Sequence, residues 1–417
     1  MRRAGAPSPV ARRLETLALP PSLCRPNTAE RITPMAPLPP LPLFPPPPSL
    51  KFAQDTKLQA AVKAAVDALA AARGGAAPAF RVAIIDLGDE KPGSTLNFGA
   101  YNGDTVDFIA SEAKIIALYA AFALRDLVER FAVGLALRTL IATGVQAFGG
   151  RKAPPSPDLF TALRTELDTH IIAAADGAIG ALPRGELLPD YKTMFVVPPG
   201  GKPDFKPSFR GAMRQMIVPS SNSGASTVIM SVGYAYISGA MKAADLFVGG
   251  KGPWLSADFA GHYHALIQST NDSAVGQAGT ALSMAKLMSI LMTGGISIRA
   301  DSFTEMQRLL ADAVDGPDTP LLTRDPSQGF TDPADTDRTK ARLRLLRNTE
   351  LTHIKLGQEW LKPKNGGHMV WSEVFRLKDL YKAGKTYAVS YQNLLTGFVR
   401  PPDMAFVIRN AIQTYEA

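Results

Sequence analysis

The stretch from Asp104 to Arg130, DTVDFIASEAKIIALYAAFALRDLVER, constrains this chain more than any other part of its sequence. Ser111 opens an apolar helix, predicted from Ile115 to about Ala147, and Lys114 follows three residues later. Because positions i and i+3 share one helix face, the amine is expected beside the hydroxyl. A lysine whose pKa is lowered by burial or by another cation can take the proton of a serine nucleophile. An isolated S-x-x-K also occurs where a serine simply caps a helix. Whether Ser111 is a nucleophile therefore depends on motifs elsewhere in the chain.

The composition is that of a globular protein, and it argues against a nucleic-acid-binding protein and against a transmembrane protein. The 417 residues are 46% hydrophobic and 20% charged. Of the net charge of +8, six arginines and two glutamates in residues 1–50 supply +4. The remainder has no basic stripe interleaved with aromatics, so no nucleic-acid partner is expected. No run reaches about 18 uninterrupted apolar residues, so no transmembrane span is expected.

Cysteine and histidine usage indicates chemistry without a metal. The single cysteine, Cys24, excludes an internal disulfide. The five histidines form no metal-binding signature; His262 and His264, two residues apart, point to opposite sides of a helix. We therefore expect no metal and no cofactor.

The pattern of elements predicts a disordered arm followed by one α/β domain. Residues 1–50 hold 14 of the 34 prolines and are predicted to be extended or disordered. After them we expect a helix from Phe52 to about Arg73, a strand hairpin, a long helical middle, three strands and a last helix. The predicted strands and the last helix are Phe80–Leu87, Thr95–Tyr101, Thr352–Leu361, Gly367–Leu377, Lys385–Asn393 and Pro402–Tyr415.

This order predicts an antiparallel sheet whose strands come from both chain ends, flanked by the terminal helices, with an inserted all-helical subdomain. The serine-bearing domain would span 51–417. Its α/β part would comprise 51–110 and 300–417, and its helical part 111–299, with an insertion at about 150–215.

Two further motifs carry hydroxyl, amide and amine groups. Ser220-Ser221-Asn222 lies in a predicted loop before a helix, where the Ser220 hydroxyl can relay a proton and the Asn222 amide can bind a carbonyl. By itself this segment is also a typical polar helix cap. Lys355-Leu356-Gly357-Gln358 lies on a predicted strand, where Lys355 can bind a carboxylate and Gly357 can admit a substrate backbone. By itself this segment is also typical of an edge strand.

The order S-x-x-K, S-x-N, K-x-G resembles that of the penicillin-recognising serine hydrolases, the serine β-lactamases and DD-peptidases, most of all those of class A. The resemblance covers about 52–417. It implies that Ser111 is the acylated nucleophile, Lys114 its base and Ser220 a proton shuttle. It further implies that Asn222 and Lys355 bind substrate, with an oxyanion hole formed by the backbone N–H groups of Ser111 and Gln358. It also implies export or a periplasmic location, although no clear signal peptide is present.

The sequence departs from the family in three respects. Ser111 and Ser220 are 109 residues apart, which is long for class A. Class A enzymes hydrolyse the acyl-enzyme with a glutamate after S-x-N, but this chain has no glutamate between Glu186 and Glu305. The carboxylates available from Asn222 up to Asp301 are Asp245, Asp258 and Asp272. Leu356 stands where a hydroxyl residue is usual, and Glu112 inside the first motif is also unusual, although an acid is favourable in a first helical turn.

Three functions remain open from the sequence. The first is a serine hydrolase acting through an acyl-enzyme on a small-molecule or peptide substrate, such as a β-lactam or a peptidoglycan peptide. The second is an esterase on the same fold, which needs Ser111, Lys114 and an oxyanion hole. The third is a binding or sensor module that keeps the fold and turns over little. The sequence identifies neither the substrate nor the oligomeric state.

Overall fold

All described residues belong to the second of two compact units, Leu41–Ala417. The computed structural model describes residues 42–44, 50–75, 79–88, 95–149, 158–175, 188–199, 201–262, 264–272, 274–294, 298–314, 349–360, 369–379, 385–395 and 401–417. The predicted arm at 1–50 lies outside these residues apart from 42–44 and residue 50. Parts of the predicted insertion at 150–215 also lie outside them.

A six-stranded sheet is formed by strands from both ends of the chain, which confirms that part of the prediction. Its order is β1-β3-β2-β13-β12-β11, and every neighbouring pair is antiparallel except β1 and β3. The strands are β1 (Lys51–Gln54), β2 (Arg81–Asp86), β3 (Thr95–Tyr101), β11 (Thr349–Trp360), β12 (Met369–Asp379) and β13 (Thr386–Leu395). The β11 strand therefore lies at one edge of the sheet.

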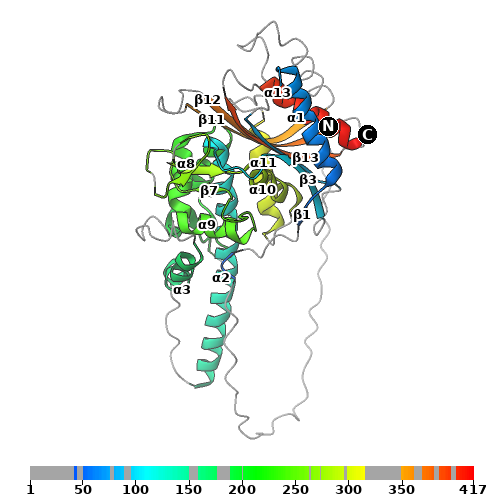
Figure 1. Ribbon diagram of the computed structural model, residues 1–417. Helices are drawn as coiled ribbons and strands as arrows, with labels where there is room; N and C mark the ends of the chain where they lie inside the picture. Colours follow the sequence, from blue (N-terminus) through cyan, green and yellow to red (C-terminus); the bar gives the residue numbers. More distant parts are fainter. Residues whose placement is uncertain are drawn as a thin grey trace, which may run out of the picture. The chain divides into compact units, whose positions relative to one another are not determined.

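Helices cover both faces of this sheet (Figure 1). On one face α1 (Thr56–Ala72) packs beside α13 (Pro401–Glu416), as the predicted flanking helices require. On the other face α10 (Ala281–Thr293) contacts β2, β12 and β13, while α11 (Ala300–Asp312) contacts β11. Because both faces are covered, consecutive residues of β2 from Val82 to Ile85 are 0% exposed, whichever way their side chains point.

The predicted start of the first helix at Phe52 is wrong. Residues 51–54 instead form β1, in register with β3 from Lys51 opposite Thr95. The helix begins at Thr56 because Asp55 caps it: the Asp55 side chain accepts a hydrogen bond of 2.7 Å from the backbone N–H of Leu58. Four residues are too few to show the two-residue alternation that identifies a strand.

The long middle of the chain is built around α2 (Lys114–Gly149). Every residue from Ile115 to Leu124 is at most 1% exposed, so this first part of the helix is apolar on all sides because it is enclosed on all sides. The helices that follow it are α3 (Leu159–Ala174), α6 (Tyr191–Met194), α7 (Pro207–Ile217), α8 (Asn222–Val232) and α9 (Tyr234–Ala243).

Short strands interrupt this helical middle. The three-stranded sheet β4-β10-β7 consists of Asp107–Phe108, Gln277–Gly279 and Trp254–Leu255. Two small pairs are β5 (Phe195–Val196) with β6 (Asp204–Phe205), and β8 (Ile267–Gln268) with β9 (Ala274–Val275). The inserted all-helical subdomain and its boundaries therefore stay predictions, while the mixed α/β class is confirmed.

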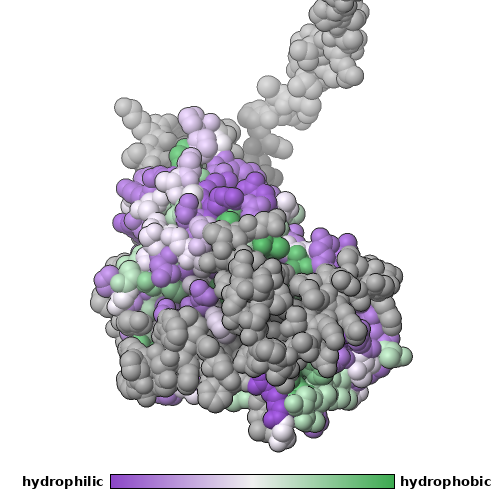
Figure 2. All heavy atoms as spheres, turned by 90° about the horizontal axis from the view of Figure 1, so that it is seen from above, coloured by the Kyte–Doolittle hydropathy of each residue, from purple (hydrophilic) through white to green (hydrophobic). Residues whose placement is uncertain are grey.

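The surface contributes little to an argument for membrane insertion. Among the described residues, no helix combines the length and the hydropathy needed to span a bilayer. Where the face in Figure 2 is coloured, hydrophilic residues predominate and hydrophobic ones lie in small groups.

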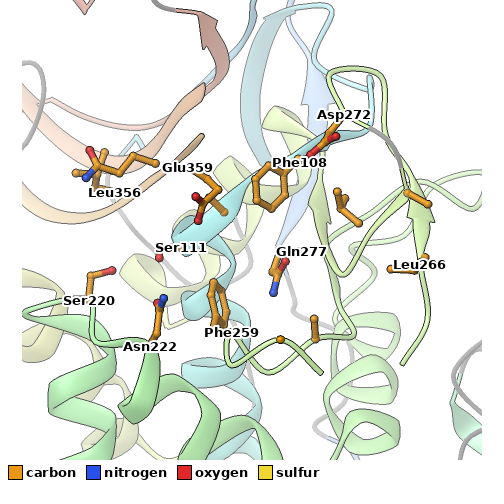
Figure 3. A pocket seen from close by; sticks show the side chains of 16 residues that line it. Phe108, Ser111, Ser220, Asn222, Phe259, Leu266, Asp272, Gln277, Leu356 and Glu359 are labelled. Carbon is orange, nitrogen blue, oxygen red and sulfur yellow. The ribbon is translucent and has the colours of Figure 1, made fainter. Parts of the chain in front are cut away.

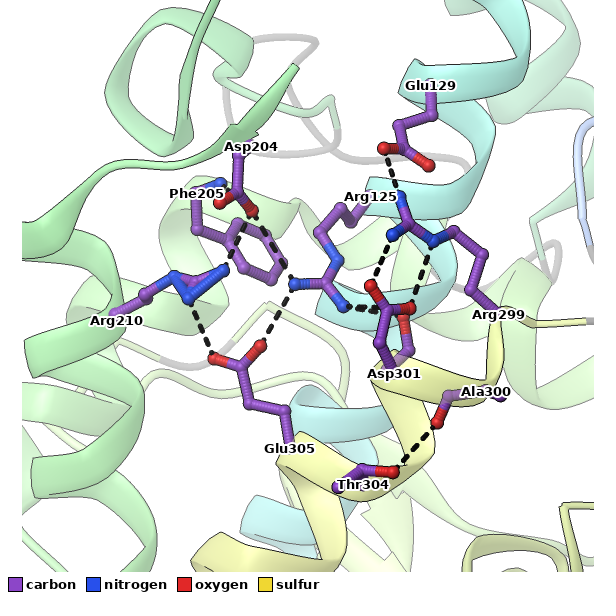
Figure 4. Close-up of polar contacts among 11 residues, drawn as sticks. Arg125, Glu129, Asp204, Phe205, Arg210, Arg299, Ala300, Asp301, Thr304 and Glu305 are labelled. Carbon is purple, nitrogen blue, oxygen red and sulfur yellow. Dashed lines mark hydrogen bonds and ion pairs between the residues drawn. The ribbon is translucent and has the colours of Figure 1, made fainter. Parts of the chain in front are cut away.

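A buried arginine joins three elements of the helical part (Figure 4). Arg125 on α2 is 4% exposed, and its guanidinium donates to Glu305 at 3.0 Å and to Ser302 at 2.7 Å, both on α11. It also lies 3.6 Å from the Asp204 carboxylate of β6 and stacks 5.1 Å from the Phe205 ring centroid. Both terminal nitrogens of the guanidinium thus have partners, which offsets part of the cost of burying its charge, while its Nε has no hydrogen-bond partner among the described residues.

A second arginine extends this network to α7. Arg210 donates to Asp204 at 2.8 Å and contacts Glu305 at 3.2 Å. The network therefore fastens α7 to α2 and α11, and the C-terminal end of α7 leads into the loop that carries Ser220.

We expect Arg125→Met to lower the free energy of unfolding by about 3 kcal/mol, because it removes the buried cation of the network and leaves Asp204 and Glu305 with Arg210 alone. Thermal or urea unfolding at neutral pH measures the loss. Arg214→Met is the matched control, since its pair with Asp312 is 54% and 36% exposed. That control should lose less than about 1 kcal/mol. Equal losses in the two variants would contradict a stabilising role for the network.

Candidate active site

Ser111 lies in a tight turn between the small sheet and the central helix. The 3-10 helix η1 (Ala110–Ala113) carries it, and α2 begins at Lys114, one residue before the predicted start at Ile115. In a 3-10 helix residues i and i+3 eclipse each other, which keeps Ser111 and Lys114 on one side. Ala110 has φ of +46°, a conformation that a residue with a Cβ adopts only when its surroundings impose it.

The Ser220 loop is a second strained turn, between α7 and α8. Ser220 has φ of +54°. On its far side Ser221 caps α8, because its hydroxyl accepts a hydrogen bond of 3.2 Å from the N–H of Gly224. The Ser221 N–H donates to the carbonyl of Gln215 at 2.8 Å, which ties the loop to the end of α7. The capping role expected for this segment therefore belongs to Ser221, and Ser220 and Asn222 face the cleft.

The structure brings Lys114, Ser220, Asn222 and Lys355 into one hydrogen-bonded cluster. Lys114 Nζ donates to the carbonyl of Ser220 and to Oδ1 of Asn222 at 2.8 Å, and lies 3.3 Å from Ser220 Oγ. Lys355 Nζ donates to the same Ser220 Oγ at 2.7 Å and to the carbonyl of Leu356 at 3.0 Å. Lys114 is 0% and Lys355 is 2% exposed. One hydroxyl thus connects two buried amines that are 241 positions apart in the sequence.

The cluster opens on a cleft of about 550 Å³ (Figure 3). Ser111, Ser220, Asn222, Leu356 and Gln358 line it, so the three motifs meet at one cavity. Its further wall is supplied by the small strands and their loops, through Phe108, Leu266, Val275 and Gln277. A volume of this size admits a ligand of drug-like or short-peptide dimensions.

Gly357 is required for a reason other than the predicted substrate approach. A Cβ on Gly357 would lie 2.3 Å from the carbonyl oxygen of Ile109 and 2.7 Å from the backbone N of Glu112. Its missing side chain therefore lets β11 contact the turn that carries Ser111. Gln358, the next residue, lines the cleft, and its role as an oxyanion donor with Ser111 stays a prediction.

Phe259 also lines the cleft, although no sequence motif predicts it there. Its ring centroid lies 4.7 Å from Lys114 Nζ, and its φ is +63°. The neighbouring Asp258 holds the loop, because its carboxylate accepts from the backbone N–H of Ala260 at 2.9 Å and of His262 at 3.0 Å. No periodicity or motif marks a phenylalanine in an irregular loop, so only the folded chain identifies it.

The three carboxylates considered for deacylation occupy different places. Burial alone would raise the pKa of Asp258, but hydrogen bonds from the His262 ring and the loop backbone outweigh burial and lower it. Its contact with His262 Nδ1 is 2.8 Å. Asp245 lies beyond the end of α9 at φ of +55°, and Asp272 lines the cleft. Asp272 is therefore the one of the three that shares the cavity with Ser111.

Glu112 is buried rather than placed at an open first turn of a helix. It is 0% exposed, and Ser390 Oγ on β13 donates to its Oε1 at 3.0 Å. Burial raises the pKa of its carboxyl group to about 8, against hydrogen bonds from Ser372 and Ser390 that act in the opposite direction. The acid thus lies in the first turn of η1, as the sequence indicates, with its carboxyl group in the interior of the protein.

The chain is similar in arrangement to solved β-lactamases. The one from Chitinophaga pinensis is 13% identical with a TM-score of 0.44, over 85% of this chain and 98% of that one. The one from Sphaerobacter thermophilus is 16% identical with a TM-score of 0.38, over 85% and 97%. A class A enzyme from Mycobacterium abscessus is 10% identical with a TM-score of 0.43, over 85% and 100%. No protein-family model and no curated protein matches the chain.

At such identities no residue role passes from those proteins to this chain. The chemistry has to be derived from the contacts of Ser111, Lys114, Ser220 and Lys355 themselves.

Gly357→Ala should destabilise the protein by roughly 1–3 kcal/mol, because the added methyl group meets the backbone of the Ser111 turn. Thermal unfolding measures the effect. Gly211→Ala on α7 is the matched control: a Cβ there meets nothing within 4 Å, and alanine is favoured in a helix. A fully tolerated Gly357→Ala would mean that β11 and the Ser111 turn are not in close contact.

Proposed function

We propose that this chain is a serine hydrolase that forms an acyl-enzyme at Ser111 from an amide or an ester. The observation that carries the proposal is the hydrogen-bonded cluster in which two buried amines, Lys114 and Lys355, share the hydroxyl of Ser220 beside the cleft that Ser111 lines. Burial of like charges so close together disfavours the doubly protonated state. One amine is therefore available as a neutral base.

Hydrogen-bond directions support Lys114 as that base. Its contacts with the Ser220 carbonyl and with Asn222 use two N–H groups, which is what a neutral amine has. Its third contact, with Ser220 Oγ at 3.3 Å, is then the direction in which the lone pair of a neutral amine would accept a hydroxyl proton. Lys355, with Ser220 Oγ and the Leu356 carbonyl as acceptors, is the amine that keeps its charge.

The proposed acylation moves one proton around this cluster. Ser111 Oγ attacks the substrate carbonyl and forms the C–O bond while its proton passes to Lys114. The tetrahedral intermediate places its negative charge against backbone N–H donors, for which Ser111 and Gln358 are the candidates. The proton then passes from Lys114 through Ser220 to the leaving nitrogen or oxygen, and the bond to that atom breaks. Lys355 supplies positive charge for a substrate carboxylate.

The cleft favours acylation over hydrolysis of large acyl groups. The ring centroid of Phe259 lies 4.7 Å from Lys114 Nζ, so the ring takes up space beside this amine. The loop carboxylate next to it, Asp258, is already engaged by His262 and by two backbone N–H groups. The same contact favours the second candidate, a module that senses a ligand by keeping a long-lived acyl group, and a small-ester esterase is compatible with it.

Ser111→Ala should abolish covalent labelling by a fluorophosphonate and leave the melting temperature nearly unchanged, because the hydroxyl is the acceptor of the label. Lys114→Arg should lose most of the labelling rate, since a guanidinium does not give up its proton. Mass spectrometry of the intact protein measures both.

Ser223→Ala is the control for this experiment. Its hydroxyl is exposed and bonds to Ser221 at 2.9 Å, away from the lysine cluster, so labelling should persist. Labelling of Ser111→Ala at the rate of the unmodified protein would end the assignment of the nucleophile.

Benzylpenicillin should give a stoichiometric adduct on Ser111 that reverses slowly, because loss of general-base assistance costs roughly 10²–10⁴-fold in rate. Nitrophenyl acetate should turn over, since its small acyl group leaves room for water. Time-resolved mass spectrometry measures adduct lifetime, and Phe259→Gly, which removes the ring and relieves the positive φ, should shorten it. Penicillin turnover at roughly 10 per second would contradict this and would direct attention to Asp272 as a base.

A further inference from the structure

A buried acid lies directly beneath the nucleophile and takes no part in the acylation steps. Glu112 follows Ser111 in the chain, and its side chain points into the sheet between β12 and β13. Its Oε1 accepts from Ser390 Oγ at 3.0 Å, and the side chains of Ser372 and Gln392 also act on the pKa of the carboxyl group. All four of these residues are at most 1% exposed.

Burial decides the charge of this acid. The pKa of Glu112 is raised from an ordinary 4.5 to about 8, chiefly by desolvation and further by the charge of Glu373. The hydrogen bonds from Ser372, Ser390 and Gln392 lower it by less. At neutral pH Glu112 is therefore mainly a neutral carboxylic acid.

One serine connects this acid to the turn that carries the nucleophile. Ser372 Oγ donates to the carbonyl of Ile109 at 2.9 Å. Ile109 is followed by Ala110, whose φ of +46° needs support, and then by Ser111. A hydroxyl has one proton to donate. Beside a neutral acid that proton stays with the Ile109 carbonyl, whereas a carboxylate competes for it.

The other titratable groups around η1 have their own partners. Tyr391 on β13 donates to Glu373 on β12. The amines of Lys114 on α2 and Lys355 on β11 are directed at Ser220. On β4, Asp107 pairs with Arg81 at 3.1 Å, and the residues of β10 do not ionise. Glu373 is thus the neighbour whose charge acts on Glu112.

We propose that Glu112 is a positioning residue that holds the Ser111 turn on the sheet while it is a neutral acid, and that its ionisation loosens the turn and slows acylation. The proton lost from Glu112 passes to solvent, and no bond to substrate is involved. This inference rests on the proposed acylation of Ser111, but the state of the acid also governs stability and can be tested without it.

The test compares the unmodified protein with Glu112→Gln, which keeps the shape and removes the ionisation. Fluorophosphonate labelling of the unmodified protein should fall above about pH 8, by about tenfold for each further pH unit. At neutral pH the labelling rate of Glu112→Gln should be within about threefold of that of the unmodified protein. The fall in labelling above about pH 8, here called the alkaline limb, should be absent from this variant. Glu350→Gln, an exposed residue at the start of β11, is the matched control and should keep the limb.

Melting temperatures supply the second measurement. Because the folded pKa lies above the unfolded one, the native state binds the extra proton, and stability falls as pH rises from about 4.5 through about 8. Glu112→Gln should lack that part of the fall and should melt higher than the unmodified protein at about pH 9.

Three results would overturn the proposal. The alkaline limb could persist unchanged in Glu112→Gln. That variant could lose labelling by more than about tenfold at neutral pH while folded, which would mean that the carboxylate itself is needed. The melting profiles of the two proteins could coincide across the range. If Ser111 is not labelled at any pH, the proposed function is wrong. The melting profiles alone then test whether ionisation of Glu112 destabilises the fold.

Discussion

The shared hydroxyl of Ser220 is the contact on which the arrangement of this protein depends. Removing two amines from water is costly unless each finds acceptors at short range. Here the amines come from α2 and β11, and their acceptors come from the loop before α8, from the first residue of α8 and from β11, so these elements have to be held at fixed separations. The enclosed helix α2 and the Arg125 network provide that rigidity, because they join the loop-bearing α7 to the same helix that carries Lys114.

Backbone strain collects around the same cleft. Of the six non-glycine residues with positive φ among those described, Ala110, Ser220 and Phe259 border this cavity. Each costs of order 1 kcal/mol or more and persists because its surroundings over-determine it. The Ile109 carbonyl is bonded by Ser372, the Ser220 carbonyl by Lys114, and the Phe259 loop by Asp258. The strained residues that line the cleft are thus held by bonds made to the backbone in and beside them.

Sequence periodicity predicted the elements well where they are long. The strands from Phe80 and Thr95 and those of the C-terminal part are present within a few residues, because alternation and β-branched residues persist over six or more positions. The residues of the lysine cluster were also predictable, since each stands in a motif. Burial of Glu112 was not, because one acid in an apolar stretch has no sequence pattern that separates a solvated side chain from a desolvated one. Phe259 was not predictable for a similar reason.

Acylation and hydrolysis make different demands on this site, and the contacts meet them unequally. The proposed acylation needs a proton path from Ser111 to the leaving group, and the contact of 3.3 Å between Lys114 Nζ and Ser220 Oγ would be one part of it. Hydrolysis needs a base facing the acyl carbonyl with space for water beside it. Lys114 could serve as that base, but Phe259 occupies the space next to its amine. In the proposed reaction the size of the acyl group would therefore decide the outcome: a small one would leave a path for water around the ring, whereas a bulky one would close the cleft over Ser111 and stay bound.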